Sequence, residues 1–167
     1  MPRTSRAVLA LAVWAGIAQA QLAPPDPDWK EVEAPPPPQL RTDGLVQIDM
    51  SSSALRFGVD PASVAVGADG IVRYVVVATS STGAVNALYE GVRCSTAEVR
   101  LYARHSPDRG WVQLQDSRWQ PLHENRVSGH SLVIARNGAC IGSAPNQNAA
   151  RVVRDLGGSA NWRFWNN

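Results

Sequence analysis

The fold is decided by residues 71–104, which read IVRYVVVATSSTGAVNALYEGVRCSTAEVRLYAR. Three runs rich in β-branched and aromatic residues, 71–79, 85–94 and 98–104, are separated by two short polar segments. Such runs are typical of strands, and gaps this short join antiparallel neighbours, because a parallel connection needs a dozen or more residues. The stretch therefore predicts two successive β-hairpins.

Further strands and late helices surround these hairpins. Four other runs have strand character, and turn residues separate them: 45–49, 54–59, 63–66 and 111–115. Helical periodicity appears weakly over 130–137 and clearly over 147–156, where Asn146 or Asn148 can cap the start and Gly157-Gly158 can end the helix. Strands followed by helices are typical of the α+β class. We therefore predict an antiparallel β-meander sheet with one or two C-terminal helices packed on one face.

The N-terminus has the organisation of a secretory signal peptide. Within residues 1–20, Arg3 and Arg6 precede an apolar run over 7–18, and small residues lie at the expected cleavage site after Ala20. The apolar run is shorter than the roughly 20 residues that span a bilayer, although an uncleaved N-terminal anchor is the alternative. We expect an exported protein in the periplasm of a bacterium with two membranes, with no membrane span in the mature chain.

The charge balance argues against nucleic acid as a partner. The chain has 16 basic and 14 acidic residues, and Arg3 and Arg6 belong to the signal peptide. Without these two, both numbers are 14, so the mature chain has a net charge of zero. Domains that bind polyanions usually carry a clear basic excess. We therefore expect no nucleic-acid partner.

A proline-rich segment follows the signal peptide. Residues 21–44 contain two proline clusters, including four consecutive prolines at 35–38. Proline fixes φ and lacks an N–H, so neither a helix nor a central strand can pass through them. We expect an extended linker of polyproline II character and then a single domain over 45–167. Trp29, between the clusters, either docks on that domain or is exposed in a mobile arm.

Cys94 and Cys140 are the two cysteines of the chain. In an exported protein, an even number of cysteines most simply forms disulfides, so we predict a Cys94–Cys140 bond. The alternative is a nucleophilic thiol with a spare cysteine. The chain has no Cys-x-x-Cys motif, which would indicate redox chemistry.

Several segments together resemble a known family. They are DWKEVEAPPPP at 28–38, the long run at 55–94, WQPL at 119–122 and the later Cys140, and VRYVVVATSSTGAVNALYEGVRC within the long run is the most specific. They resemble the cryptic neisserial protein-like (CNP1-like) family of exported bacterial proteins over nearly the whole mature chain. The resemblance implies export and a single domain, and it assigns no catalytic residue.

The second hairpin predicts which side chains share a face. With a two-residue turn at Ser95-Thr96, Arg93 opposes Glu98 and Tyr89 opposes Tyr102. A three-residue turn would instead set Glu90 against Tyr102. The first register gives a core face made of Leu88, Val92, Cys94, Val99, Leu101 and Ala103.

Glu90 falls on this core face. If the preceding hairpin turns at Thr82-Gly83, Val75 opposes Glu90 and Arg73 lies diagonally beside it. Because a buried carboxylate needs a partner, we predict a structural Arg73–Glu90 ion pair. The alternative is a carboxylate tuned for acid–base chemistry.

The opposite face is the candidate binding surface. It is predicted to carry Tyr74, Tyr89, Gly91, Arg93, Arg100 and Tyr102, with Gly91 leaving a dip between the rings. Tyrosine and arginine suit an anionic or sugar-like ligand or a protein hot spot. The alternative is ordinary packing of the tyrosines beneath the N-terminal arm. A one-residue slip in either register would invert the faces.

Motifs for catalysis are sparse. His105, His123 and His130 have no metal-binding spacing, and His130 is expected to cap a helix or lie on the surface. No GxSxG, P-loop or GxGxxG motif occurs, so we assign no catalytic residue, metal or cofactor. The leading hypothesis is a non-enzymatic envelope module that binds an envelope protein or a small ligand through the tyrosine–arginine face. The alternatives are a small envelope hydrolase using Glu90 or a histidine, and a mainly structural domain.

Overall fold

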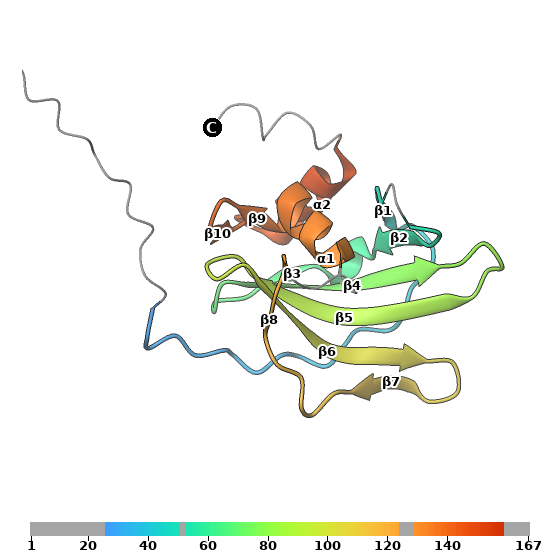
Figure 1. Cartoon of the computed structure of the whole chain (residues 1–167), viewed down its shortest axis with the longest axis horizontal. Coiled ribbons are helices and arrows are strands. Elements are labelled where there is room, and N and C mark those ends of the chain that lie inside the picture. The colour runs from blue at the N-terminus through green and yellow to red at the C-terminus, as the bar shows by residue number, and fades with distance from the viewer. Residues whose placement is uncertain (1–25, 51–52, 124–128, 159–167) are drawn as a thin grey trace, which may run out of the picture.

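A computed structural model describes residues 26–50, 53–123 and 129–158, and an antiparallel sheet forms its centre (Figure 1). Six strands follow one another across the sheet: β1 (Val46–Ile48), β2 (Arg56–Val59), β4 (Ile71–Thr79), β5 (Val85–Arg93), β6 (Glu98–Ser106) and β7 (Gly110–Gln113). In addition, β3 (Ala65–Val66) pairs with β4, and β8 (Gln120–Pro121) pairs with β6. The predicted pair of hairpins, β4–β5–β6, is confirmed as the middle of the sheet.

Two helices lie on one face of this sheet (Figure 1). α1 (Gly129–Ile134) continues into a π-helical turn over Ala135–Ala139, and the short hairpin of β9 (Cys140–Ile141) and β10 (Ala144–Pro145) leads to α2 (Ala149–Gly157). The Asn148 side chain caps α2 by accepting a 3.0 Å hydrogen bond from the backbone N–H of Arg151. The predicted α+β class is confirmed. Neither helix of the described residues is long and apolar enough to cross a membrane.

The main core lies between the sheet and the helices. Val72 and Val76 on β4 pack in one cluster with Ile134, Val152 and Leu156 from the helical layer, and each is at most 6% exposed. Full burial of such a side chain contributes about 1.5 to 3 kcal/mol. This contact therefore fixes the helices on one face and leaves the other face for the N-terminal segment.

The β5–β6 register begins as predicted and then shifts. Arg93 opposes Glu98, but an irregularity at Tyr89 adds one residue to β6, so Tyr89 opposes Ala103 rather than Tyr102. Side chains beyond a bulge change face. Ala103 consequently packs with Tyr89 on the face away from the helices, and its predicted place on the helix-facing core is wrong.

The β4–β5 turn is one residue longer than the predicted Thr82-Gly83 turn. The backbone N–H of Ser80 donates a 3.0 Å hydrogen bond to the carbonyl of Ala84, so Ser81–Gly83 form the loop. Gly83 has a φ of +84°, the left-handed conformation that commonly closes a three-residue hairpin loop. Loop length sets the register of a hairpin, so the extra residue affects the whole of β4.

The longer turn shifts β4 by one residue against β5. Tyr74, not Val75, opposes Glu90, and Arg73 opposes Gly91. Because side chains alternate along a strand, Tyr74 points toward the helices and Arg73 points to the other face. The predictions that Tyr74 belongs to the tyrosine–arginine face and that Arg73 lies beside Glu90 are therefore wrong.

The described part of the proline-rich segment lies across the face away from the helices. We call residues 26–44, which form neither helix nor strand, the strap. Its Leu40 packs against the smaller apolar cluster of this face, which includes Val75 and Tyr89. The guanidinium of Arg93 lies 3.5 Å from the ring centroid of Trp29. Of the two alternatives for Trp29, the structure shows docking.

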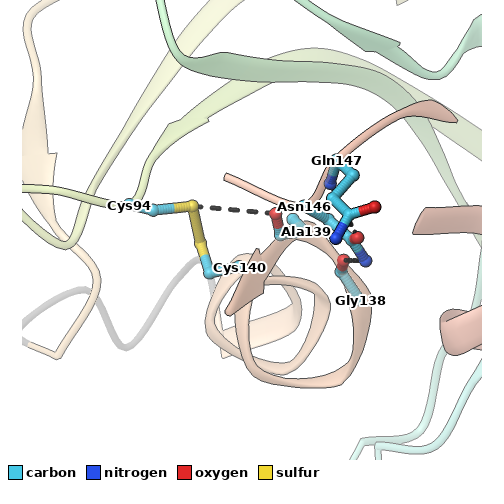
Figure 2. Close-up of a disulfide and its surroundings, with 6 residues drawn as sticks. All are labelled: Cys94, Gly138, Ala139, Cys140, Asn146 and Gln147. Atoms are coloured by element: carbon cyan, nitrogen blue, oxygen red, sulfur yellow. Dashed lines mark hydrogen bonds between the residues drawn. A yellow bond between two sulfur atoms is a disulfide. The ribbon is translucent and has the colours of Figure 1, made fainter. Parts of the chain in front are cut away.

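The predicted Cys94–Cys140 disulfide is present and joins the sheet to the helical layer (Figure 2). Cys94 directly follows β5, and Cys140 follows the π-helical turn, with 5.7 Å between the Cα atoms. The buried Asn146 fixes the same turn, because its backbone N–H donates to the carbonyl of Ala139 and its side-chain amide donates to that of Gly138, each at 2.8 Å. Both cysteines are oxidised, so the alternative of a free nucleophilic thiol is excluded.

Replacing both cysteines with serine is expected to lower the free energy of unfolding by roughly 3 to 4 kcal/mol, because the disulfide limits the unfolded chain. The bond joins residues 46 positions apart in the sequence. Urea unfolding followed by circular dichroism measures the loss. A reducing agent should destabilise the wild type equally and leave the serine variant unchanged. Equal stability of the two proteins would contradict this role.

Candidate functional site

The sheet face beneath the strap holds five of the six residues predicted as a binding surface. They are Tyr89, Gly91, Arg93, Arg100 and Tyr102. Tyr74 packs in the core on the helix side instead. Arg73 takes a place on this face, directly opposite Gly91. The face is therefore more cationic than the sequence alone predicts.

Gly91 allows Tyr102 to lie close to the sheet. A Cβ at position 91 would be 2.8 Å from the Tyr102 ring edge, 2.8 Å from its hydroxyl and 2.8 Å from Ile71 Cγ2. Only glycine leaves room for this close approach. The Tyr89 ring packs beside Tyr102, with 5.5 Å between the centroids. The predicted dip at Gly91 is thus filled by Tyr102, whose hydroxyl reaches the strap.

Glu31 of the strap is held by three donors of this face. Arg100 Nη1 donates to Oε2 at 2.6 Å, Trp119 Nε1 donates to Oε2 at 3.1 Å, and Tyr102 Oη donates to Oε1 at 2.7 Å. Arg73 Nη2 lies 3.8 Å from Oε1. Hydrogen bonds to a charged acceptor are about twice as strong as neutral ones, and this carboxylate side chain is only 16% exposed. The face forms a carboxylate-binding site, which the chain's own Glu31 occupies.

Val32, the next residue, is held through its backbone. Its N–H donates to Asp69 Oδ2 at 3.0 Å, and its carbonyl accepts from Arg73 Nη2 at 2.9 Å. Asp69 and Arg73 also bond to each other at 2.7 Å. Burial acts to raise the pKa of Asp69, but the hydrogen bonds from Arg73 and from two backbone N–H groups outweigh it and hold that pKa below its usual value. The Asp69–Arg73 ion pair therefore binds both backbone polar groups of Val32, although Val32 is 54% exposed.

Trp29 occupies a second side-chain site, two residues before Glu31. The cation–π contact with Arg93 covers one face of the indole, and the edge-on ring of Trp119 lies 6.2 Å away between centroids. Its Nε1 donates a 2.8 Å hydrogen bond to the backbone carbonyl of Asp69. The Trp29 ring is therefore bound by a guanidinium, by a second aromatic ring and through its single hydrogen-bond donor.

Alternation along the strap explains which of its residues are bound. Trp29 and Glu31 point toward the sheet, whereas Lys30 and Val32 are exposed, as expected for an extended chain. The sheet side of these contacts, which we call the strap receptor, consists of Asp69, Arg73, Arg93, Arg100, Tyr102 and Trp119. Sequence reasoning missed Glu31, Asp69 and Trp119 as members of the site. The available signal was the Trp-x-Glu spacing between two proline clusters.

The proline end of the strap meets aromatic side chains. Trp111 Nε1 donates a 2.8 Å hydrogen bond to the carbonyl of Pro38. A pocket of about 340 Å³ lies between Pro35 and Pro37 on one side and Tyr89 and Tyr102 on the other. Aromatic grooves that bind proline-rich peptides use the same combination of ring surface and carbonyl recognition. The strap is thus bound as a peptide along its length.

Glu90 does not pair with Arg73, contrary to prediction, because the register shift places the two on opposite faces. Glu90 is 2% exposed; its Oε2 accepts from Ser131 Oγ at 2.8 Å and Tyr74 Oη at 3.1 Å, and its Oε1 lies 3.0 Å from His130 Nε2. His130 is only 3% exposed, so its predicted role as a cap or surface residue is also wrong. Both carboxylate oxygens are hydrogen-bonded within the core.

The histidines are separated from one another. His105 packs edge-on against Trp111, His123 is exposed, and His130 contacts Glu90. In the described ranges, no three His, Cys, Asp or Glu side chains come together as they would to hold a metal ion.

All three tyrosines are expected to resist ionisation. Burial raises the pKa of Tyr74, Tyr89 and Tyr102; the charge of Glu90 adds to this for Tyr74, and the hydrogen bond to Glu31 adds for Tyr102. An ordinary phenol is half ionised near pH 10. At that pH the folded protein should show little phenolate ultraviolet absorbance, whereas the urea-unfolded chain should show about half of its full value.

Because the three tyrosine pKa values are raised in the folded protein, its stability falls at high pH. The stability that the neutral phenols contribute is fully present below about pH 10 and is lost as the pH rises toward the folded-state pKa values. Half-ionised tyrosines in the folded protein near pH 10 would contradict the burial described above.

Comparison with known proteins agrees with the expected resemblance. The model of the CNP1-like family matches residues 25–157, a span that includes the strap together with the sheet and both helices. No curated protein and no solved structure matches the chain. Since the match covers well over half of the sequence, the chain belongs to the CNP1-like family.

Proposed function

We propose that this protein is an exported, non-enzymatic binding module of the bacterial cell envelope, which holds an extended acidic peptide on its strap receptor. The observation that carries the proposal is the capture of the Glu31 carboxylate by Arg100, Tyr102 and Trp119. These donors come from β6 and from the connection after β7, so none of them belongs to the strap. A peptide with the same features can make the same contacts.

The receptor favours an acidic occupant. Arg73 is balanced by Asp69 beside it, but Arg100 and Arg93 depend on Glu31 and on the Trp29 ring, which belong to the strap. Leaving a buried charged donor without a partner costs more than about 1 to 3 kcal/mol. An occupant without a carboxylate at this point is therefore disfavoured.

The receptor also defines a peptide pattern. It accepts an aromatic side chain at the position of Trp29 and a carboxylate at the position of Glu31, and it binds the next residue through its backbone. The exposed side chains of Lys30 and Val32 are not selected. The preferred peptide is thus extended, carries a Trp-x-Glu motif and continues into prolines.

Export is part of the proposal. We infer that residues 1–20, which lie outside the described part of the chain, form a signal peptide cleaved after Ala20, and that the mature protein resides in the periplasm. The Cys94–Cys140 disulfide supports this location, because such bonds persist in oxidising compartments.

The rival function, a small hydrolase, is supported by one observation. Glu90 contacts His130 and lines a pocket of about 620 Å³ over β6, with Leu101, Arg104 and Arg118 among its walls. Three hydrogen-bond partners occupy the carboxylate, and it is 2% exposed. That geometry favours a structural role, since a general base must reach the proton that it removes.

Glu90→Gln separates the two roles. We expect it to lower the free energy of unfolding by about 1 to 3 kcal/mol, because the new amide N–H₂ would face donors in the core. Urea unfolding measures the change, with Asp108→Asn in an exposed turn as the control. A variant of unchanged stability that loses hydrolysis of envelope material would instead support the enzyme.

In-cell crosslinking of the tagged protein in the periplasm, followed by mass spectrometry, tests the binding function. Arg100→Ala should reduce the yield of the crosslinked partner at least tenfold, because a charge-assisted hydrogen bond of about 1.5 kcal/mol or more is lost. Tyr89→Ala should reduce it too, since Tyr89 supports Tyr102.

Arg104→Ala is the matched control, because Arg104 lies on the same strand, is exposed and lines the pocket that contains Glu90. Circular dichroism verifies that each variant is folded. Equal crosslinking yields from Arg100→Ala and Arg104→Ala would refute binding through the strap receptor.

A further inference from the structure

We propose that the strap receptor binds the strap of a second copy of this chain, so that two molecules exchange straps and form a closed dimer. The inference rests on the proposed function of the receptor and names its partner. Three observations carry it: the strap makes few bonds within itself, a hinge joins it to the domain, and strap and receptor have opposite charges.

The strap has almost no structure of its own. Its hydrogen bonds to the rest of the molecule join residues at least 37 positions apart, from Val32–Asp69 to Glu31–Trp119. Bonds within it are confined to the turn at Asp26, which accepts from Asp28 N and Trp29 N. Every anchoring contact is therefore with the receptor side, and an identical strap from another molecule can replace it without loss.

The last four residues of the strap, 41–44, form a short exposed segment that leads to β1. Residues 41–44 are all exposed, and the one ion pair shown there, between Arg41 and Asp60, is 3.9 Å long. Gly44 has a φ of +64°, so this position can change conformation at little steric cost. Hinges of this kind absorb the backbone rotation that moves a whole segment.

The proline run makes the strap move as a unit. The four consecutive prolines 35–38 favour polyproline II, in which they would span about 12 Å without internal hydrogen bonds. A stiff segment keeps Trp29 and Glu31 at a fixed distance from the hinge rather than letting them collapse onto it. Rotation at 41–44 therefore delivers both anchors together to a neighbouring molecule.

Charge favours the encounter between two copies. Residues 26–40 contain four acidic residues, Asp26, Asp28, Glu31 and Glu33, and one lysine. The receptor contains three arginines and one aspartate. Complementary charge raises the rate of association. Reciprocal exchange fills both receptors, so the assembly closes as a two-fold dimer instead of growing further.

Concentration decides between the two forms. Within one molecule the strap is present at an effective concentration on the order of millimolar, so dilute folding favours the closed monomer. The protein purified from the periplasm is unfolded in urea with its disulfide intact, refolded at high and at low concentration, and analysed by size exclusion with light scattering. We expect a dimer whose fraction rises with the concentration during refolding.

Two variants identify the strap as the exchanged element. Glu31→Gln impairs the strap but leaves the receptor intact, and Arg100→Ala impairs the receptor but leaves the strap intact. Each variant alone weakens the same contact in the closed monomer and in the exchanged dimer, so its dimer fraction should stay close to that of the wild type. Refolding the two together should enrich the mixed dimer, because one of its two contacts then joins an intact strap to an intact receptor. Arg104→Ala should dimerise like the wild type. A monomer at every concentration, or mixed dimers no more abundant than random pairing of the two variants gives, would overturn the exchange.

A synthetic peptide of residues 26–40 distinguishes the failure of this inference from the failure of the proposed function. It should bind the full-length Glu31→Gln protein at least tenfold more tightly than the Glu31→Gln/Arg100→Ala protein. Binding of the peptide without any dimer would overturn exchange and leave the receptor in place for a different protein. Absence of peptide binding together with a monomeric wild type would overturn both.

Discussion

The three-residue loop Ser81–Gly83 is the constraint on which the rest of the structure depends. It sets the register of β4 against β5, and that register decides which side chains meet the helices and which meet the strap. With one residue fewer, Arg73 would face an apolar core and Tyr74 would face the strap. The carboxylate site and the backbone contact at Val32 both follow from the longer turn.

The two faces of the sheet bury charge in different ways. On the helix side, Glu90 is surrounded by two hydroxyl groups and an imidazole, so its hydrogen bonds are satisfied within one cluster of the core. On the strap side, Arg100 obtains its carboxylate from a segment remote in sequence. The first arrangement is complete once the domain has folded, whereas the second requires the strap to arrive. That difference explains why a binding role is better supported on the strap side.

Much of the fold could be predicted because its signals are local. The β-branched and aromatic runs within 71–104 were sufficient for the central strands and the two cysteines for the disulfide. The predicted cap at Asn146 or Asn148 was sufficient for the start of α2, and the structure selects Asn148. The faces were harder, because a Thr-Gly turn and a Ser-Thr-Gly loop are both compatible with that sequence and differ by the one residue that inverts a strand. The bulge that moves Ala103 to the strap side has no comparable signal in the sequence.

The candidate site was predicted in part for the same reason. Arg93, Arg100 and Tyr102 share a sheet face that alternation reveals, whereas Glu31 contacts residues 42 to 88 positions away. No spacing rule connects positions so distant in the chain. Asp69 lies in the turn before β4, where its local sequence indicates no site, although its carboxylate binds the backbone of the strap.

The strap also has a consequence for colloidal stability. In the described part of the chain β7 is the last strand of the sheet, and the outer strand of a sheet exposes unpaired backbone groups that can recruit other chains. Trp111 of β7 bonds to Pro38, which places proline next to this strand. Proline has no N–H with which to extend a ladder. The docked strap therefore lies beside the outer strand, where it would hinder another chain from adding to the sheet.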